Sequence, residues 1–180
     1  MIPEPLNQRA ADLGVNLHQG RHELIDELEP LWLSMFDHHL STGAAGLAVV
    51  ARSESWPRRQ ALYQQLLQSD DAFVVLARRG PTAVGYALAH VHDAPDDTWD
   101  TGDRIGEVES LAVLPTERGR GLGTLLLDYA EAVLESLGAQ DVTIGVVVGN
   151  TDAQRFYERR GMTPAMVKLL RIGPKPASQA

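Results

Sequence analysis

A glycine-rich stretch in the second half of the chain has the composition of a phosphate-binding turn. It reads Arg118-Gly119-Arg120-Gly121-Leu122-Gly123-Thr124 and follows an apolar run, Val108 to Val113. A segment with helical periodicity begins at Leu122. Backbone N–H groups of such a turn can point at an anion, and the helix N-terminus adds unpaired donors and partial positive charge. Glycine leaves room for phosphates and tolerates positive φ. We therefore expect a pyrophosphate to bind here.

The spacing within this stretch distinguishes between phosphate-binding motifs. A Walker loop ends in Gly-Lys-Ser/Thr, which is absent, and a dinucleotide fingerprint would need glycine where Thr124 stands. The spacing Arg118-x-x-Gly121-x-Gly123 resembles the R/Q-x-x-G-x-G/A motif of the GNAT superfamily of N-acetyltransferases. In that family the motif follows a strand, begins a helix and holds the diphosphate of acetyl-coenzyme A. The resemblance implies that all seven residues from Arg118 to Thr124 contact this coenzyme.

A second motif supports the resemblance. The β-branched run from Val142 to Val148 predicts a buried strand. The chain after it is similar to the family's N-x-x-A-x-x-F-Y-x-x-x-G-F pattern, with Met162 in place of the final Phe. Either Asn150 or Thr151 can cap the helix that follows, and Asn150 can instead hold the pantetheine arm. The resemblance spans about residues 72–171. It implies coenzyme contacts from Asn150, Ala153, Phe156 and Tyr157.

Acyl transfer to an amine needs both a base and an acid. An alkyl amine has a pKa of about 10 and must lose a proton before it attacks, while the departing thiolate must gain one. Tyr157 is the candidate acid, because relatives commonly place there a tyrosine that hydrogen-bonds the coenzyme sulfur. Glu107 is the first candidate base, at the place where several relatives carry a catalytic glutamate. Glu109 is its rival, because residues two apart on a strand share a face unless a bulge intervenes. A water chain could replace both.

The strand that precedes the glycine-rich turn has a further implied role. In the family its backbone pairs with the pantetheine arm like a missing strand, which here assigns coenzyme contacts to Leu111, Ala112 and Val113. A backbone N–H of this segment would stabilise the developing oxyanion.

The histidines and one acidic segment allow other interpretations. His90 and His92 would share one face of a strand and could bind a metal, but no third ligand stands at a suggestive spacing, so no metal site is predicted. His92 or His39 could instead lie near the acceptor pocket. The segment from Asp93 to Asp103 is interpreted as a solvated loop, or as a loop that attracts a cationic amine and stacks it on Trp99.

Composition limits the class of protein. The chain has 180 residues, 44% hydrophobic and 22% charged, no cysteine and a net charge of −8. These values predict one domain over residues 1–180, with flexible tails at 1–13 and 173–180. The absence of cysteine excludes disulfides and thiolate chemistry, and the negative charge argues against nucleic acid as a partner. Without a long apolar run or a signal sequence, we expect a cytoplasmic protein with no membrane partner.

The order of the elements predicts a mixed α/β architecture. Helical periodicity covers residues 21–39 with a break at Pro30, a helix beginning near Ser55, and residues 122–137. Strands are predicted at residues 15–18, 73–78, 83–92, 107–113, 142–148 and 165–172.

The resemblance implies the GNAT acyl-CoA N-acyltransferase fold and, with it, a function. In this fold a mostly antiparallel central sheet, splayed between its fourth and fifth strands, is flanked by about four helices. The expected function is direct acetyl transfer from acetyl-coenzyme A to a primary amine, borne by a small molecule or a peptide or protein, in a ternary complex. The alternative is an inactive acyl-CoA-binding sensor. A homodimer is common in the family.

Overall fold

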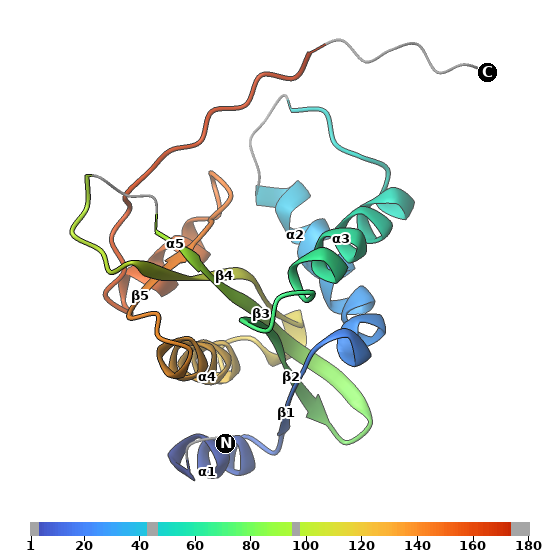
Figure 1. Cartoon of the computed structure of the whole chain (residues 1–180). Coiled ribbons are helices and arrows are strands. Elements are labelled where there is room, and N and C mark those ends of the chain that lie inside the picture. Colours follow the sequence, from blue (N-terminus) through green and yellow to red (C-terminus); the bar gives the residue numbers. More distant parts are fainter. Residues whose placement is uncertain (1–3, 43–46, 95–97, 174–180) are drawn as a thin grey trace.

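The computed structural model describes residues 4–42, 47–94 and 98–173 (Figure 1). Within these ranges it has five α-helices, two short 3-10 helices and five strands. The helices are α1 (Glu4–Asp12), η1 (His22–Leu28), α2 (Glu29–Thr42), α3 (Arg52–Leu66), η2 (Pro115–Glu117), α4 (Leu122–Ser136) and α5 (Thr151–Glu158). The strands are β1 (Asn16–Gly20), β2 (Ala72–Arg79), β3 (Thr82–Asp93), β4 (Arg104–Val113) and β5 (Asp141–Ile144).

The five strands form one mixed sheet in the order β1-β2-β3-β4-β5. The first three pairs are antiparallel, and β4 pairs with β5 in parallel. A parallel pair needs a long crossover, which α4 supplies. The ladder between β4 and β5 ends at the pair Val108–Ile144, so the rest of β4 pairs with no described strand on that side. The expected mostly antiparallel sheet, splayed between its fourth and fifth strands, is thereby confirmed.

Helices cover both faces of the sheet (Figure 1). On one face, α1 and α4 pack over a core that includes Val75, Leu126 and Tyr129. On the other face, η1, α2 and α3 enclose a second core around Leu28 and Tyr63. We call these the α4 face and the α3 face. Alternate residues of the central strands serve the two cores, because successive side chains of a strand point to opposite faces.

A β-bulge in β4 interrupts this alternation. Val108 pairs with Ala89 on β3 and Ser110 pairs with Leu88, so Glu109 has no partner on that strand. Val108 packs in the core of the α4 face. Ser110, two residues later, hydrogen-bonds a tyrosine of the α3 face. The extra residue therefore places Glu109 and Ser110 side by side on the α3 face, and the parity argument from the sequence holds only up to Glu109.

The N-terminal helix corrects the sequence interpretation. Residues 1–13 were expected to form a flexible tail, whereas residues 4–12 are the helix α1. Leu6 and Ala10 are buried against the α4 face. Arg9 also pairs with Asp128 of α4 at 2.5 Å. Only these few residues face the core, which explains why the periodicity is weak. The other expected tail, residues 173–180, lies almost wholly outside the described residues.

Three other boundaries differ from the sequence interpretation. Helix α3 begins at Arg52 rather than near Ser55, so Pro57 lies in its second turn. Strand β5 ends at Ile144 and does not continue to Val148. Residues 165–172 form no strand and pair with no described strand, and their apolar side chains are exposed. The predicted break near Pro30 is confirmed by the change from η1 to α2.

None of the helices in the described part of the chain is long and apolar enough to cross a membrane.

Candidate active site

The glycine-rich turn has the backbone conformation that its sequence predicts. Gly119 and Gly121 adopt positive φ angles of 73° and 89°, and Gly121 is the N-cap residue of α4. A Cβ atom added at either glycine would meet nothing within 4 Å, so the turn is open on that side. No described residue accepts a hydrogen bond from the backbone N–H groups of residues 119–124. These donors are therefore available to an anion.

Ion pairs and one side-chain hydrogen bond anchor the turn to the sheet. Arg118 Nε donates to the carbonyl oxygen of Val113 at 3.1 Å, which ties the turn to the end of β4. Arg79 donates from Nη2 to buried Glu117 at 2.8 Å. Arg120 lies 3.9 Å from the same carboxylate and is mostly exposed. Glu117 thus holds η2 against β2 while the charge of Arg120 stays beside the open donors.

The second motif converges on the same place. Gly123 lies between β4 and α5, because a Cβ added there would be 3.8 Å from Val113 and 3.9 Å from Phe156. Asn150 caps α5, where its Oδ1 accepts from the N–H of Ala153 at 3.3 Å. The capping role was one of the two open possibilities for Asn150. The prediction that the glycine-rich turn and the motif beginning at Asn150 contribute to one site is therefore consistent with their positions, although they lie some 30 residues apart in the sequence.

Tyr157 is buried on the α4 face beside Phe156, with the two ring centroids 5.0 Å apart. Burial raises the pKa of Tyr157, so the phenol keeps its proton at neutral pH. Its hydroxyl forms no hydrogen bond with the described residues. A protonated hydroxyl without a hydrogen-bond partner among the described residues can donate to a bound ligand.

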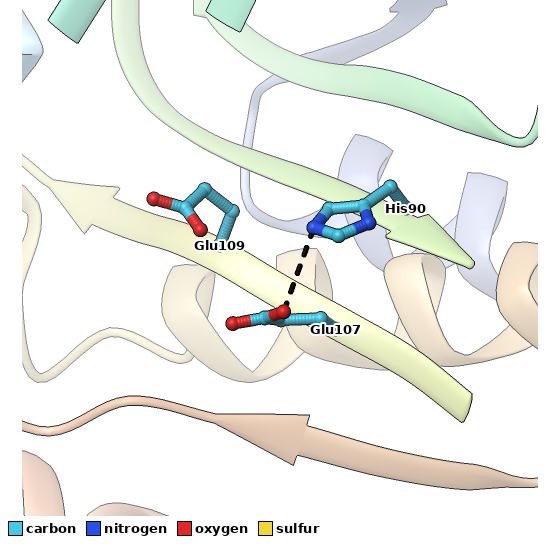
Figure 2. Close-up of side chains that lie close together, drawn as sticks. All are labelled: His90, Glu107 and Glu109. Atoms are coloured by element: carbon cyan, nitrogen blue, oxygen red, sulfur yellow. Dashed lines mark ion pairs between the residues drawn. The ribbon is translucent and has the colours of Figure 1, made fainter. Parts of the chain in front are cut away.

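The candidate bases lie on the α3 face, where β3 and β4 run side by side. Glu107 pairs in register with His90. Its Oε2 is 3.6 Å from Nε2 of His90 and 3.6 Å from Nε2 of His92. Figure 2 shows one ring nitrogen of His90 turned toward the side of β4 that carries Glu107 and Glu109. Burial lowers the pKa of His90, against the opposing effect of Glu107, so this ring favours the neutral form.

Arg59 on α3 is a site residue that the sequence interpretation missed. Its guanidinium pairs with Glu109. It also lies 4.0 Å from the ring centroid of Trp32 on α2. This cation–π contact and the ion pair together fix Arg59 between the two helices and the bulge. The only local signal is that Arg59 and Tyr63 stand one helical turn apart, on the buried face of α3.

A buried hydroxyl network lies directly under the bulge. Tyr63 donates to Oγ of Ser110 at 2.6 Å, and the hydroxyls of Tyr63 and Tyr86 are 2.8 Å apart. Burial raises the pKa values of both tyrosines, so both stay protonated. Because unpaired buried hydroxyls are costly, the network fixes the conformation of β4 where the carboxylates emerge.

The two halves of the site lie on opposite faces of the sheet. Tyr157 packs in the core of the α4 face, whereas Glu107 stands beside His90 on the α3 face. Leu111, Ala112 and Val113 pair with β3 on one edge, and no described strand pairs with them on the edge toward β5, where Arg118 donates to the carbonyl oxygen of Val113. This uncovered edge joins the glycine-rich turn to the carboxylates. An acid and a base placed in this way can act on a carbonyl from its two sides.

A hollow of about 270 Å³ lies beside Arg59, the residue that pairs with Glu109. It is lined by Trp32, Phe36, Val50, Ser55, Arg58, Arg59 and Leu62. His39 is half-buried, and its pKa is lowered by burial first and then by the charges of His38 and Arg59. Residues 95–97 of the acidic loop lie outside the described residues. Trp99 in the described part is half exposed, and its stacking role stays a prediction.

Comparison with known proteins gives matches that agree with this geometry. Residues 32–162 match the acetyltransferase (GNAT) family. A mycothiol acetyltransferase of Thermobispora bispora is 39% identical over 52% of this chain and 31% of its own length. An aminoalkylphosphonate N-acetyltransferase of Salmonella typhimurium is 38% identical over 48% of this chain and 53% of its own length. The matched region thus spans about a third to a half of these relatives.

A solved structure extends the likeness to the fold. The aminoglycoside N-acetyltransferase AAC(6')-Iy, determined in complex with coenzyme A, superposes with a TM-score of 0.67. The alignment covers 88% of this chain and 94% of that chain, at 16% sequence identity. The fold implied by the sequence is therefore confirmed, with five helices in the described residues instead of about four. The family match covers most of the chain, and the protein belongs to the acetyltransferase (GNAT) family.

Proposed function

We propose that this protein transfers the acetyl group of acetyl-coenzyme A directly to a primary amine held on the α3 face. The observation that carries the proposal is the continuous path from the open N–H donors before α4, along the uncovered edge of β4, to Glu107. In acetyl-coenzyme A the diphosphate, the pantetheine arm and the thioester follow one another in this same order. The family uses acetyl-coenzyme A, and a related structure holds coenzyme A.

Each residue has a separate role in the proposed reaction. Glu107 takes a proton from the acceptor ammonium, and the free amine attacks the thioester carbon. A backbone N–H of the Leu111–Val113 edge stabilises the oxyanion. The C–S bond then breaks and Tyr157 gives its proton to the thiolate. The adduct nitrogen loses its second proton to solvent, Glu107 releases its proton to solvent, and solvent returns one proton to the phenol. The ion pair between Arg59 and Glu109 favours Glu107 as the base, because Glu109 is already engaged.

The acceptor is proposed to be a small amine that enters the hollow beside Arg59, which measures about 270 Å³. The relatives are named for mycothiol and for aminoalkylphosphonates, and the structural neighbour for aminoglycosides. A test panel should therefore contain aminoalkylphosphonates, amino sugars, aminoglycosides, amino acids and short peptides.

The proposal is tested by two measurements on the same preparation. Calorimetry should detect stoichiometric binding of acetyl-coenzyme A, and a thiol-release assay should show turnover with one class of amine. Absence of any binding heat would overturn the proposal. Tight binding without turnover across the whole panel would instead identify a sensor of acyl-coenzyme A.

A further inference from the structure

We propose that His90, Glu107 and Glu109 form a binding site for one divalent transition-metal ion of the Zn²⁺ class. One donor atom from each of the three side chains lies within 4.8 Å of the other two. Zinc binds nitrogen and oxygen donors at about 2.0–2.2 Å, which places its ligands roughly 3.3–4 Å apart. The three groups therefore need only about 1 Å of side-chain movement to close on an ion.

The fold supplies the third ligand that the sequence did not reveal. His90 and His92 stand on β3, and the carboxylates come from β4, which runs beside it. The alternation of side chains along β4 places Glu107 and Glu109 together on the α3 face, before the bulge shifts the residues that follow (Figure 2). Donor atoms from two adjacent strands of a rigid sheet are held in place, which lowers the entropic cost of forming a site.

A second imidazole lies next to the three proposed ligands. Nε2 of His92 is 3.6 Å from Oε2 of Glu107, at the same distance as Nε2 of His90. Its other ring nitrogen, Nδ1, lies 2.9 Å from the carbonyl oxygen of Asp93, which fixes the orientation of the ring. The carboxylate of Glu107 therefore stands between two imidazole nitrogens, which are preferred ligands of Zn²⁺.

The charge balance of the cluster favours a cation. Glu107 forms no ion pair with a lysine or arginine of the described residues, and its neighbours are histidines. Glu109 gives one carboxylate oxygen, Oε1, to Arg59, and the other remains for a metal. With one arginine for two carboxylates, the group carries a net negative charge. The mixed imidazole and carboxylate donors favour Zn²⁺ and its first-row neighbours over Mg²⁺ or Ca²⁺, which prefer oxygen ligands alone.

The test is metal binding by the coenzyme-free protein. Zn²⁺ is titrated by calorimetry, and Co²⁺ is followed by its visible absorption, to which this cysteine-free chain contributes no thiolate. We expect one ion per chain, with affinity reduced at least about tenfold in both His90→Ala and Glu107→Gln. His22→Ala, an exposed histidine in η1, is the matched control and should bind as the parent does.

Two results would overturn the site: no saturable binding at one ion per chain, or binding that both cluster variants retain in full. Circular dichroism of the isosteric Glu107→Gln variant separates loss of a ligand from loss of the fold. A separate activity measurement rests on the proposed function, because a metal on Glu107 would occupy the base and inhibit transfer. If the metal-loaded protein transferred acetyl groups at an unchanged rate, the metal site would stand and Glu107 would be excluded as the base.

Discussion

Arg59 holds the carboxylate of Glu109 at the bulge of β4, while Glu107, two residues earlier, lies beside His90 and His92 and pairs with no described lysine or arginine. The two glutamates are therefore chemically different despite their proximity. The guanidinium of Arg59 occupies one oxygen of Glu109, so that oxygen is not available to an acceptor ammonium. We therefore propose Glu107 as the base and Glu109 as the residue that keeps Arg59 in place.

The first prediction separates the two glutamates. Glu107→Gln should lower turnover by about 10²–10⁴-fold, the usual contribution of a positioned base. The loss should be largest at low pH, where the amine is mostly protonated and most needs a base. The check is the pH profile of kcat/KM. Glu109→Gln is the matched control and should show a smaller loss, with a profile of unchanged shape. Equal profiles for Glu107→Gln and the parent would place the base elsewhere.

The second prediction concerns the acid. Tyr157→Phe removes one hydroxyl from a buried ring and should leave the affinity for acetyl-coenzyme A unchanged. Turnover should fall by about 10²-fold or more, because the thiolate then leaves without a proton. Single-turnover thiol release and calorimetry measure the two effects separately. Tyr129→Phe removes another buried hydroxyl, one that donates to Gln19, and should not affect release. Unchanged turnover in Tyr157→Phe would assign the ring to packing alone.

The third prediction tests the phosphate-binding turn with two glycines at opposite ends of α4. Gly121 and Gly138 have positive φ angles of 89° and 91°, so alanine at either position should cost about 1–2 kcal/mol of stability. Only Gly121→Ala should also weaken acetyl-coenzyme A binding, because its methyl group would project into the open side of the turn. Thermal unfolding and calorimetry on both variants check this. Equal binding by both variants would contradict a phosphate site at Gly121.

A stronger substitution at the same place should abolish binding. Gly121→Glu fills the turn and adds a negative charge beside the expected diphosphate, so no binding heat should remain. Circular dichroism of this variant must first show a folded chain. Retained affinity would mean that the coenzyme does not contact this turn.

The fourth prediction concerns the ion pair beneath the turn. Hydrogen bonds from Arg79 lower the pKa of Glu117 below its ordinary value. The pair therefore stabilises the folded state above the ordinary carboxyl pKa of about 4.3, and this contribution disappears as the pH falls through the lowered value. Glu117→Gln should be less stable than the parent at pH 7, and the difference should shrink in acid. Thermal unfolding at several pH values measures it, and a difference independent of pH would contradict the assignment.

Local sequence patterns were sufficient for the features that depend on local structure. The positive φ angles at Gly119 and Gly121 follow from a glycine-rich turn before a helix, and the capping of α5 by Asn150 follows from the residues around it. The mostly antiparallel sheet and its splay between the fourth and fifth strands came from the family resemblance. The turn and the cap could be predicted from the residues alone, because the backbone conformation of each depends on neighbouring residues.

Features that depend on contacts between distant segments could not be predicted. Arg59 and Glu109 are 50 residues apart, and no pattern in α3 indicates that an arginine reaches a bulge in β4. The bulge itself is defined only by the pairing with β3. The prediction of a strand at residues 165–172 was wrong for a related reason. A strand needs a neighbouring strand to pair with, and a run of apolar side chains does not show whether one is present.

The bulge at Glu109 also divides β4 into two parts with different tolerance to change. Up to the bulge, we expect side chains to determine what the surface binds, so substitutions at residues 107 and 109 should change the chemistry proposed for the acceptor side. After it, the uncovered edge of residues 111–113 offers main-chain atoms, which most substitutions leave intact. Under the proposed function, such a strand would allow the acceptor to change while the donor is held in one way.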